Sequence, residues 1–260
     1  WSFTPPTGLG EGSHNLTITA TDDAGNTSVA SEAFVVVVDT TPPVTPTLTS
    51  ATDNSEPQTG VISNGGSTND TTPAFTGSGE EGSTITLYDN GVKIGTTQVT
   101  NGSWSFTSPT LATGSHAITV TATDAMGNVS APSTAYTVNV DTTAPRVPVI
   151  QSVTDDTTPS TGVLANGQST NDTQPTFQGT AEPGATVTLY DGGLAVGSVV
   201  VGTDGSWSLS PDTPLGSGPH NLTVTATDAA GNEGPSAAFT LTVDTQAPSA
   251  PVISSVTDDV

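Results

Sequence analysis

The chain has 260 residues, of which 25 are Asp or Glu and 2 are Lys or Arg, so its formal net charge is −23. Such an acidic excess repels phosphate backbones and anionic membranes, which excludes nucleic-acid binding and membrane insertion from the expected functions. The chain has no cysteine and therefore no disulfide to join two sheets, and its 28 glycines and 20 prolines would interrupt any long helix.

One sequence pattern recurs through the chain with a period of about 100 residues. The stretch "VDTTPP" at Val38 returns as "VDTTAP" at Val140 and as "VDTQAP" at Val243. A period of this length corresponds to a whole domain and not to a solenoid unit. We therefore expect four parts: the C-terminal part of a repeat at 1–41, complete repeats at 42–143 and 144–246, and the start of a further repeat at 247–260.

Short strands are the expected elements of each repeat. Ile118, Val120 and Ala122 alternate with threonines, which is typical of a half-buried antiparallel strand. A turn-rich segment at 53–70 separates the first two strands. In chain order, seven strands are expected in the first complete repeat, near 46–51, 72–77, 84–89, 93–99, 103–107, 117–124 and 135–141.

Seven short strands in about 100 residues predict an all-β chain of tandem immunoglobulin-like β-sandwich domains in an extended rod. A fibronectin-like strand order is an alternative within the same class. Trp104 and Trp207 are expected to fill the cores of the two complete repeats. Residues 1–38 are expected to retain only the last three strands of a repeat, which could not bury a core by themselves.

Catalysis is not expected, because no nucleophile-bearing turn stands out among the many serines and the chain has only three histidines. His14, His116 and His220 occupy the same position in successive repeats, each shortly after a glycine turn. We interpret them as structural residues.

Acidic residues are expected to gather at the joints between repeats, because strand direction alternates in an antiparallel sandwich. In the first complete repeat, the last strand then finishes at the same end of the sandwich as the segment at 53–70. Two turns of the next repeat face this end. The first joint should gather Asp39, Glu80, Glu81, Asp124 and Asn128. The middle joint should gather Asp53, Glu56, Asp70, Asp141, Glu182, Asp228 and Asn232. The third joint should gather Asp155, Asp156, Asp172, Asp244, Asp258 and Asp259.

Clustered carboxylates repel one another unless a cation neutralises them, and Ca²⁺ accepts about six to eight oxygen ligands in irregular geometry. We therefore expect Ca²⁺ at the joints, with Mg²⁺ as the second choice; zinc and copper would need more Cys or His. The alternative for Asp124 and Asp228 is a tight turn that their side chains cap. The alternative for Asp141 is a strand end before the linker Thr-Thr-Ala-Pro, whose proline makes the connection stiff.

The combination of "VDTTAP", "SVTDD", "STND", "DGSWS" and "HNLTVTATDAAGN" resembles the bacterial Ig-like repeats of giant surface adhesins of the Bap-type biofilm-associated and SiiE-like non-fimbrial kinds. The resemblance implies type I secretion, a long stalk of repeats, calcium at the joints, and attachment to surfaces, host cells or biofilm matrix. By this analogy the metal would be held by the acids of these motifs, which add Asp22 to the residues of the joints: Asp22, Asp39, Asp53, Asp70, Asp124, Asp141, Asp155, Asp156, Asp172, Asp228 and Asp244.

Two main function classes follow. In the first, the chain is a calcium-stiffened stalk segment of an extracellular adhesin on the bacterial cell surface, active in cell adhesion and biofilm formation. In the second, the Ig-like domains themselves bind glycan or protein; a role as accessory domains of a secreted glycosidase is a third possibility. We expect a monomer whose partners are the adjacent repeats of the same chain, with host glycan or biofilm matrix meeting the distal part of the parent protein.

Overall fold

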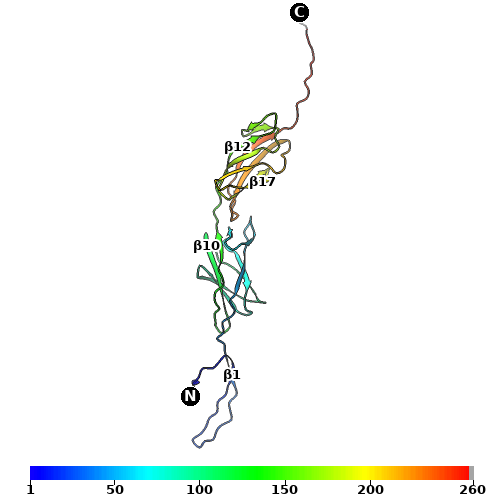
Figure 1. The fold of residues 1–260 in the computed structure, drawn as a ribbon. Coiled ribbons are helices and arrows are strands. Elements are labelled where there is room, and N and C mark those ends of the chain that lie inside the picture. The colour runs from blue at the N-terminus through cyan, green and yellow to red at the C-terminus, as the bar shows by residue number, and fades with distance from the viewer. Residues whose placement is uncertain (258–260) are drawn as a thin grey trace.

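The computed structural model describes residues 1–257, and these consist of strands and connecting segments without a helix. Figure 1 shows an extended molecule in which a hairpin, two β-sandwiches and an extended C-terminal segment follow one another end to end. The predicted all-β fold of tandem sandwich domains is confirmed. No helix in residues 1–257 is long and apolar enough to cross a membrane.

The first complete repeat, called repeat 2 (residues 42–143), has two sheets, with the strand orders β4-β3-β6-β9 and β5-β11-β10-β7-β8. Its strands are β3 Thr47–Asp53, β4 Gly60–Ile62, β5 Ser67–Thr68, β6 Ala74–Ser78, β7 Thr84–Asp89, β8 Val92–Gln98, β9 Ser103–Thr107, β10 Gly114–Thr123 and β11 Tyr136–Val140.

The second complete repeat, called repeat 3 (residues 144–246), has the same plan, with the orders β13-β12-β15-β18 and β14-β20-β19-β16-β17. Its strands are β12 Val149–Asp155, β13 Gly162–Val163, β14 Gln168–Thr170, β15 Thr176–Thr180, β16 Thr186–Asp191, β17 Leu194–Val200, β18 Ser206–Leu209, β19 Gly218–Thr227 and β20 Ala237–Val243.

The seven predicted strands of repeat 2 are all present, and the segment expected as turns contributes two more. In that segment, β4 pairs antiparallel with β3, and β5 pairs parallel with the last strand, where Thr68 is the partner of Val140. Pieces of two or three residues are too short to show an alternating pattern, so the sequence could not reveal them. Their pairing ties the start of each repeat to its end.

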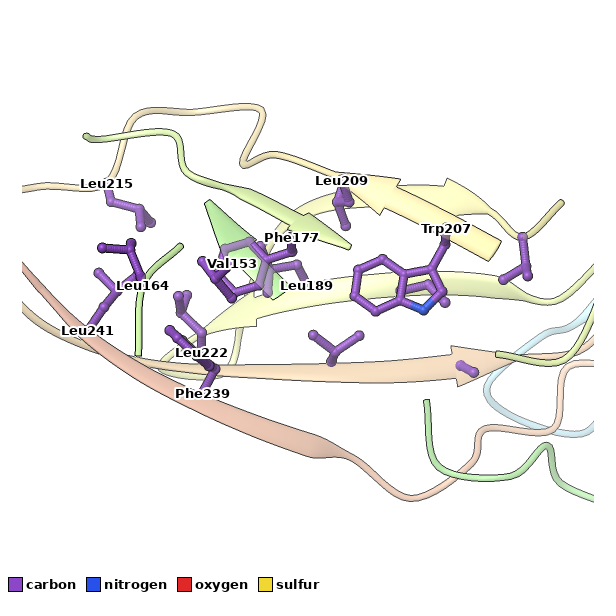
Figure 2. Close-up of a cluster of buried hydrophobic side chains, with 14 of the residues drawn as sticks. Val153, Leu164, Phe177, Leu189, Trp207, Leu209, Leu215, Leu222, Phe239 and Leu241 are labelled. Carbon is purple, nitrogen blue, oxygen red and sulfur yellow. The ribbon is translucent and has the colours of Figure 1, made fainter. Parts of the chain in front are cut away.

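Apolar side chains from both sheets meet in one core per repeat. Ile118, Val120 and Ala122 are fully buried, and Trp104 and Trp207 are 3% and 4% exposed, which confirms the predicted core positions. Figure 2 shows the core of repeat 3, with Trp207 at one end and the cluster around Val153, Phe177 and Leu189 beside it. Two of its rings, Phe177 and Phe239, meet edge to face with centroids 5.9 Å apart.

A histidine links two strands in each complete repeat, and it is buried in repeat 2 and partly buried in repeat 3. In repeat 2, His116 Nδ1 lies 2.7 Å from Asp89 Oδ2, and its Nε2 lies 2.7 Å from the Ala112 carbonyl oxygen. Burial favours the neutral ring, but the carbonyl and the carboxylate outweigh it and raise the pKa of His116. Since both ring nitrogens face acceptors, the doubly protonated imidazolium is the form that fits. His220 makes the equivalent contacts, with the same rise in pKa.

The N-terminal repeat, residues 1–41, consists of a hairpin of β1 Gly12–Leu16 and β2 Phe34–Val38. The expectation of a third strand is wrong, because residues 1–3 are not paired and Trp1 is 94% exposed. In repeat 2 the equivalent strand, β9, pairs with β6, and residues 1–41 provide no strand of that kind. The apolar face of this hairpin therefore stays open.

Candidate functional site at the joint between repeats

The middle joint connects repeat 2 to repeat 3 through a linker that lies directly on repeat 3. The linker leaves β11 at Asp141, and its prolines Pro145 and Pro148 are buried. At Gly234, between β19 and β20, an added Cβ would lie 2.4 Å from the carbonyl oxygen of Pro145. Glycine at this position thus allows the two backbones to approach each other.

A turn of repeat 3, Asp228-Ala-Ala-Gly-Asn232, faces this joint. Asp228 Oδ1 accepts hydrogen bonds from the backbone N–H groups of Ala230 (2.8 Å) and Asn232 (2.9 Å), and its Oδ2 accepts one from the Asn232 side-chain amide (2.8 Å). The carboxylate therefore caps its own turn, as the alternative interpretation of this motif predicts.

Asn232 also carries a direct contact across the joint. Its side-chain amide donates a second hydrogen bond, of 2.8 Å, to the backbone carbonyl of Asp141 in repeat 2. One side chain thus bridges the turn of repeat 3 and the end of β11. Asn232 and Asp141 are two residues that strand direction assigns to the same joint.

The tip of the turn packs on the β3–β6 connection of repeat 2. An added Cβ on Gly231 would lie 2.9 Å from Gln58 Cβ and 3.6 Å from Asn69 Nδ2. The preceding Ala230 is only 3% exposed, whereas its counterpart Met126 at the first joint is 57% exposed. The middle joint is therefore a closed contact between the two repeats.

Three of the predicted acids border one small hollow at this joint. Asp141 of repeat 2 and Glu182 and Asp228 of repeat 3 line a space of about 190 Å³, together with Ser67. Their common location is the one that strand direction predicts. Within residues 1–257, however, no three acidic or histidine side chains stand close enough together to hold a metal ion.

Asp53 and Asp70 lie at the same end of repeat 2 but do not line that hollow. Asp53 Oδ2 accepts a 2.5 Å hydrogen bond from the Thr68 hydroxyl, and Asp70 Oδ2 accepts the N–H of Asn54 at 2.9 Å. Both are buried, with exposures of 7% and 2%. They hold the β3–β6 connection in the shape against which Gly231 packs.

Repeat 3 contains the same acid network. Asp155 Oδ2 accepts the Thr170 hydroxyl at 2.5 Å, and Asp172 Oδ2 accepts the N–H of Asp156 at 3.2 Å. The Asp156 side chain itself is exposed. Asp155 and Asp244 border a hollow at the far end of repeat 3. Asp258 and Asp259, also expected there, lie outside the described residues.

The first joint has part of the middle joint's contacts. The Asn128 side-chain amide donates to the carbonyl of Asp39 at 2.9 Å and to Asp124 Oδ2 at 2.8 Å, and the latter bond lowers the pKa of Asp124. The Asn26 side chain lowers the pKa of Asp22 in the same way in the N-terminal repeat.

Glu80 and Glu81, which were expected at the first joint, accept hydrogen bonds from the N–H groups of Val44 and Gly102. Val44 belongs to the linker, so Glu80 holds the entry of the chain into repeat 2. Glu81 instead holds a turn within that repeat.

Five residues of the middle joint had not been singled out from the sequence, although the first three belong to the segment and the turn expected there: Gln58, Asn69, Gly231, Gly234 and Pro145. The repeated Asp-x-x-Gly-Asn pattern signals a turn, but no local pattern shows which distant loop the turn will touch. The contacts of Gly231 with Gln58 and Asn69 join residues more than 150 positions apart, so they depend on how one domain is placed on the next.

Comparisons with known proteins agree with this architecture. Residues 1–40, 44–142 and 146–245 match the bacterial Ig-like domain, and residues 100–191 also match the bacterial Ig-like domain of group 3. Exoglucanase B of Cellulomonas fimi is 33% identical over 256 residues, which cover 94% of this chain and 21% of that protein. The chain thus spans about a fifth of the length of this curated relative.

Solved structures that match the chain include fibronectin(III)-like modules of Clostridium thermocellum CbhA and the BSP domain of a biofilm-associated protein. The first is 14% identical, covers 68% of this chain and 87% of its own, and has a TM-score of 0.43. The second is 24% identical, covers 78% of this chain and 30% of its own, and has a TM-score of 0.28. On the family matches, which span most of its length, the chain belongs to the bacterial Ig-like domain family.

Proposed function

We propose that the chain is a spacer segment of an extracellular bacterial protein, in which sandwiches joined at fixed angles hold the flanking parts apart. The observation that supports this most directly is the middle joint, where Asn232 bonds to the Asp141 carbonyl and the turn tip is buried. A strand of 10 residues such as β19 is about 33 Å long, so each repeat adds roughly that length to the spacer.

The first candidate for the parent protein is a large, type I-secreted surface adhesin that mediates attachment and biofilm formation. The evenly spaced, similar repeats and the acids at their ends support it, because a stalk needs many equivalent, well-solvated units. The described residues show no ligand groove built from exposed aromatic side chains within repeats 2 and 3, whose tryptophans are buried.

The second candidate is an accessory region of a secreted glycosidase. Its support is the 33% identity to a segment of a protein named exoglucanase B. A spacer suits this setting as well, since it would separate a catalytic domain from a second module. Both candidates assign the same mechanical task to residues 42–246.

We further propose that the hollow bordered by Asp141, Glu182 and Asp228 takes Ca²⁺. All three donors are carboxylates and Ser67 adds a hydroxyl, a set of hard oxygen ligands that suits calcium. The carboxylates would have to close in around the ion, and the long side chain of Glu182 allows this. Bound calcium would offset the repulsion among them and would tie repeat 2 to repeat 3.

Calcium dependence can be measured by small-angle scattering and thermal melting, with calcium and then with a chelator. At about 100 times the Kd, one site that only the folded state offers adds about 2.7 kcal/mol to the free energy of unfolding. Asp141→Asn should reduce the calcium effect and leave the metal-free melting temperature nearly unchanged. The matched control is Asp204→Asn, which removes the same charge from an exposed turn.

Equal scattering curves and melting temperatures with calcium and with chelator would contradict the calcium proposal. The spacer proposal would then depend on the direct contacts alone, and it would fail if the scattering showed freely jointed domains in both conditions.

A further inference from the structure

The far end of repeat 3 carries an open hollow of about 530 Å³. Its lining includes Asp155, Ser160, Asn171 and Asp244, together with the residues that follow Asp244. The side-chain oxygen Oδ1 of Asn171 is buried and has no hydrogen-bond partner among the described residues, and the same is true of Asn69 Oδ1 at the corresponding position of repeat 2. The hollow's lining residues 244–247 begin the C-terminal segment, which leaves the upper sandwich of Figure 1 near its top.

The same surface of repeat 2 is covered by a turn of its neighbour. Ser160 and Asn171 correspond in sequence to Gln58 and Asn69, which contact Gly231 of repeat 3. Asp244 likewise corresponds to Asp141, whose carbonyl accepts the Asn232 amide. The acid network that shapes this surface is also the same in both repeats. Repeat 3 therefore presents a preformed copy of the surface that receives a turn at the middle joint.

The C-terminal segment carries the start of a further domain. Residues 247–257, "APSAPVISSVT", follow residues 144–154, "APRVPVIQSVT", position by position. Val153 of repeat 3 is fully buried, whereas Val256, its counterpart in the C-terminal segment, is 87% exposed. The segment thus has the apolar pattern of a first strand without a core to cover it.

We propose that the hollow at the end of repeat 3 is a socket for the Asp-x-x-Gly-Asn turn of a further repeat that continues from residues 247–257. The asparagine of that turn would donate to the Asp244 carbonyl, and its glycine would pass over Ser160 and Asn171. Glycine is needed in the turn because the equivalent residue at the middle joint, Gly231, has a φ of +90°, and a Cβ added there would lie 2.9 Å from Gln58 Cβ.

We expect this turn to belong to the same chain and not to a second molecule. A single turn is far smaller than the roughly 1,200 Å² of surface that stable complexes of separate proteins bury. A short linker raises the effective concentration of the turn to about the millimolar range, so a weak contact is sufficient. The proposal does not depend on calcium.

The test uses the chain lengthened after residue 260 by a copy of residues 158–246, which completes the further repeat. Since the chain has no cysteine, one introduced thiol can be followed by its rate of labelling. The cysteine replaces the added copy of Ala230, at the tip of the added turn. Two benchmarks are Met126→Cys, at an exposed position, and Ala230→Cys, at a buried one.

In chelator, the added cysteine should react on the order of tenfold more slowly than Met126→Cys and close to the rate of Ala230→Cys. Ser160→Trp, which fills the socket from an exposed loop position, should restore fast labelling; Ser160→Arg is a second blocking variant. Labelling as fast as that of Met126→Cys in the unblocked chain would overturn the proposal. Protection that grows with protein concentration would overturn it too, since it would indicate a second copy in the socket.

Discussion

Replacing Asn232 with alanine tests whether the middle joint is held by direct contacts. The change removes the 2.8 Å hydrogen bond to the Asp141 carbonyl, the one side-chain bond to the neighbouring repeat that this residue makes. A net hydrogen bond contributes about 1 kcal/mol. The ratio of docked to undocked joints should therefore fall about fivefold, because RT is about 0.59 kcal/mol.

Pulsed EPR distances between spin labels on the two repeats would measure this change. Lys93→Cys and Ala195→Cys place labels at exposed, equivalent positions of repeats 2 and 3. The distance distribution should broaden in Asn232→Ala. Asn128→Ala removes the same pair of bonds at the first joint and should leave the distribution unchanged. An unaltered width in Asn232→Ala would refute the view that this contact restrains the joint.

Two further predictions concern the stability of the repeats. Since the folded-state pKa of His116 is raised, its pairing with Asp89 stabilises repeat 2 fully below about pH 6.5 and is lost as pH rises through the folded value. The free energy of unfolding, measured with urea, should be lower at about pH 9 than at about pH 6, and this difference should be smaller in His116→Gln. Equal differences in the two proteins would contradict the stabilising role of the His116–Asp89 pair. Gly179→Ala should destabilise repeat 3 by about 3 kcal/mol or more, because the new Cβ would lie 1.8 Å from a backbone carbonyl oxygen and 2.6 Å from the Trp207 ring. Gly216→Ala, with nothing within 4 Å, should melt like the parent protein, and similar melting of both variants would contradict the packing argument.

The strands could largely be predicted because their signal is local. The stretches 84–89 and 103–107 are β7 and β9 as expected, since Thr-Ile-Thr-Leu in the first and Ser-Trp-Ser-Phe-Thr in the second alternate polar and apolar residues between clear turns. The short strands β4 and β5 were missed, because pairing with β3 and β11 creates them and no pattern of their own does. Pairing also explains the opposite error at residues 1–3, which have a strand-like sequence but form no strand because no neighbouring strand is there to pair with them.

The sequence predicted at which joint the acids of the candidate site gather, but not which contacts each carboxylate makes. Strand direction is enough to bring Asp141, Glu182 and Asp228 to one joint, and the structure places them around one hollow. The same rule placed Asp53 and Asp70 there, yet both turn inward to cap the backbone. A carboxylate that can reach nearby N–H and O–H donors satisfies itself locally, and the sequence does not show which choice each one makes.

By itself, the sequence determined the repeat period, the sandwich class and the pole at which the acids gather, because each of these follows from local alternation and from the order of the strands. Only the tertiary structure decided that the joint is a turn seated on a loop, with Gly231 over Gln58 and Asn232 bonded to the Asp141 carbonyl. Contacts of this kind depend on shape matching between surfaces far apart in the chain, and local sequence patterns do not encode that matching.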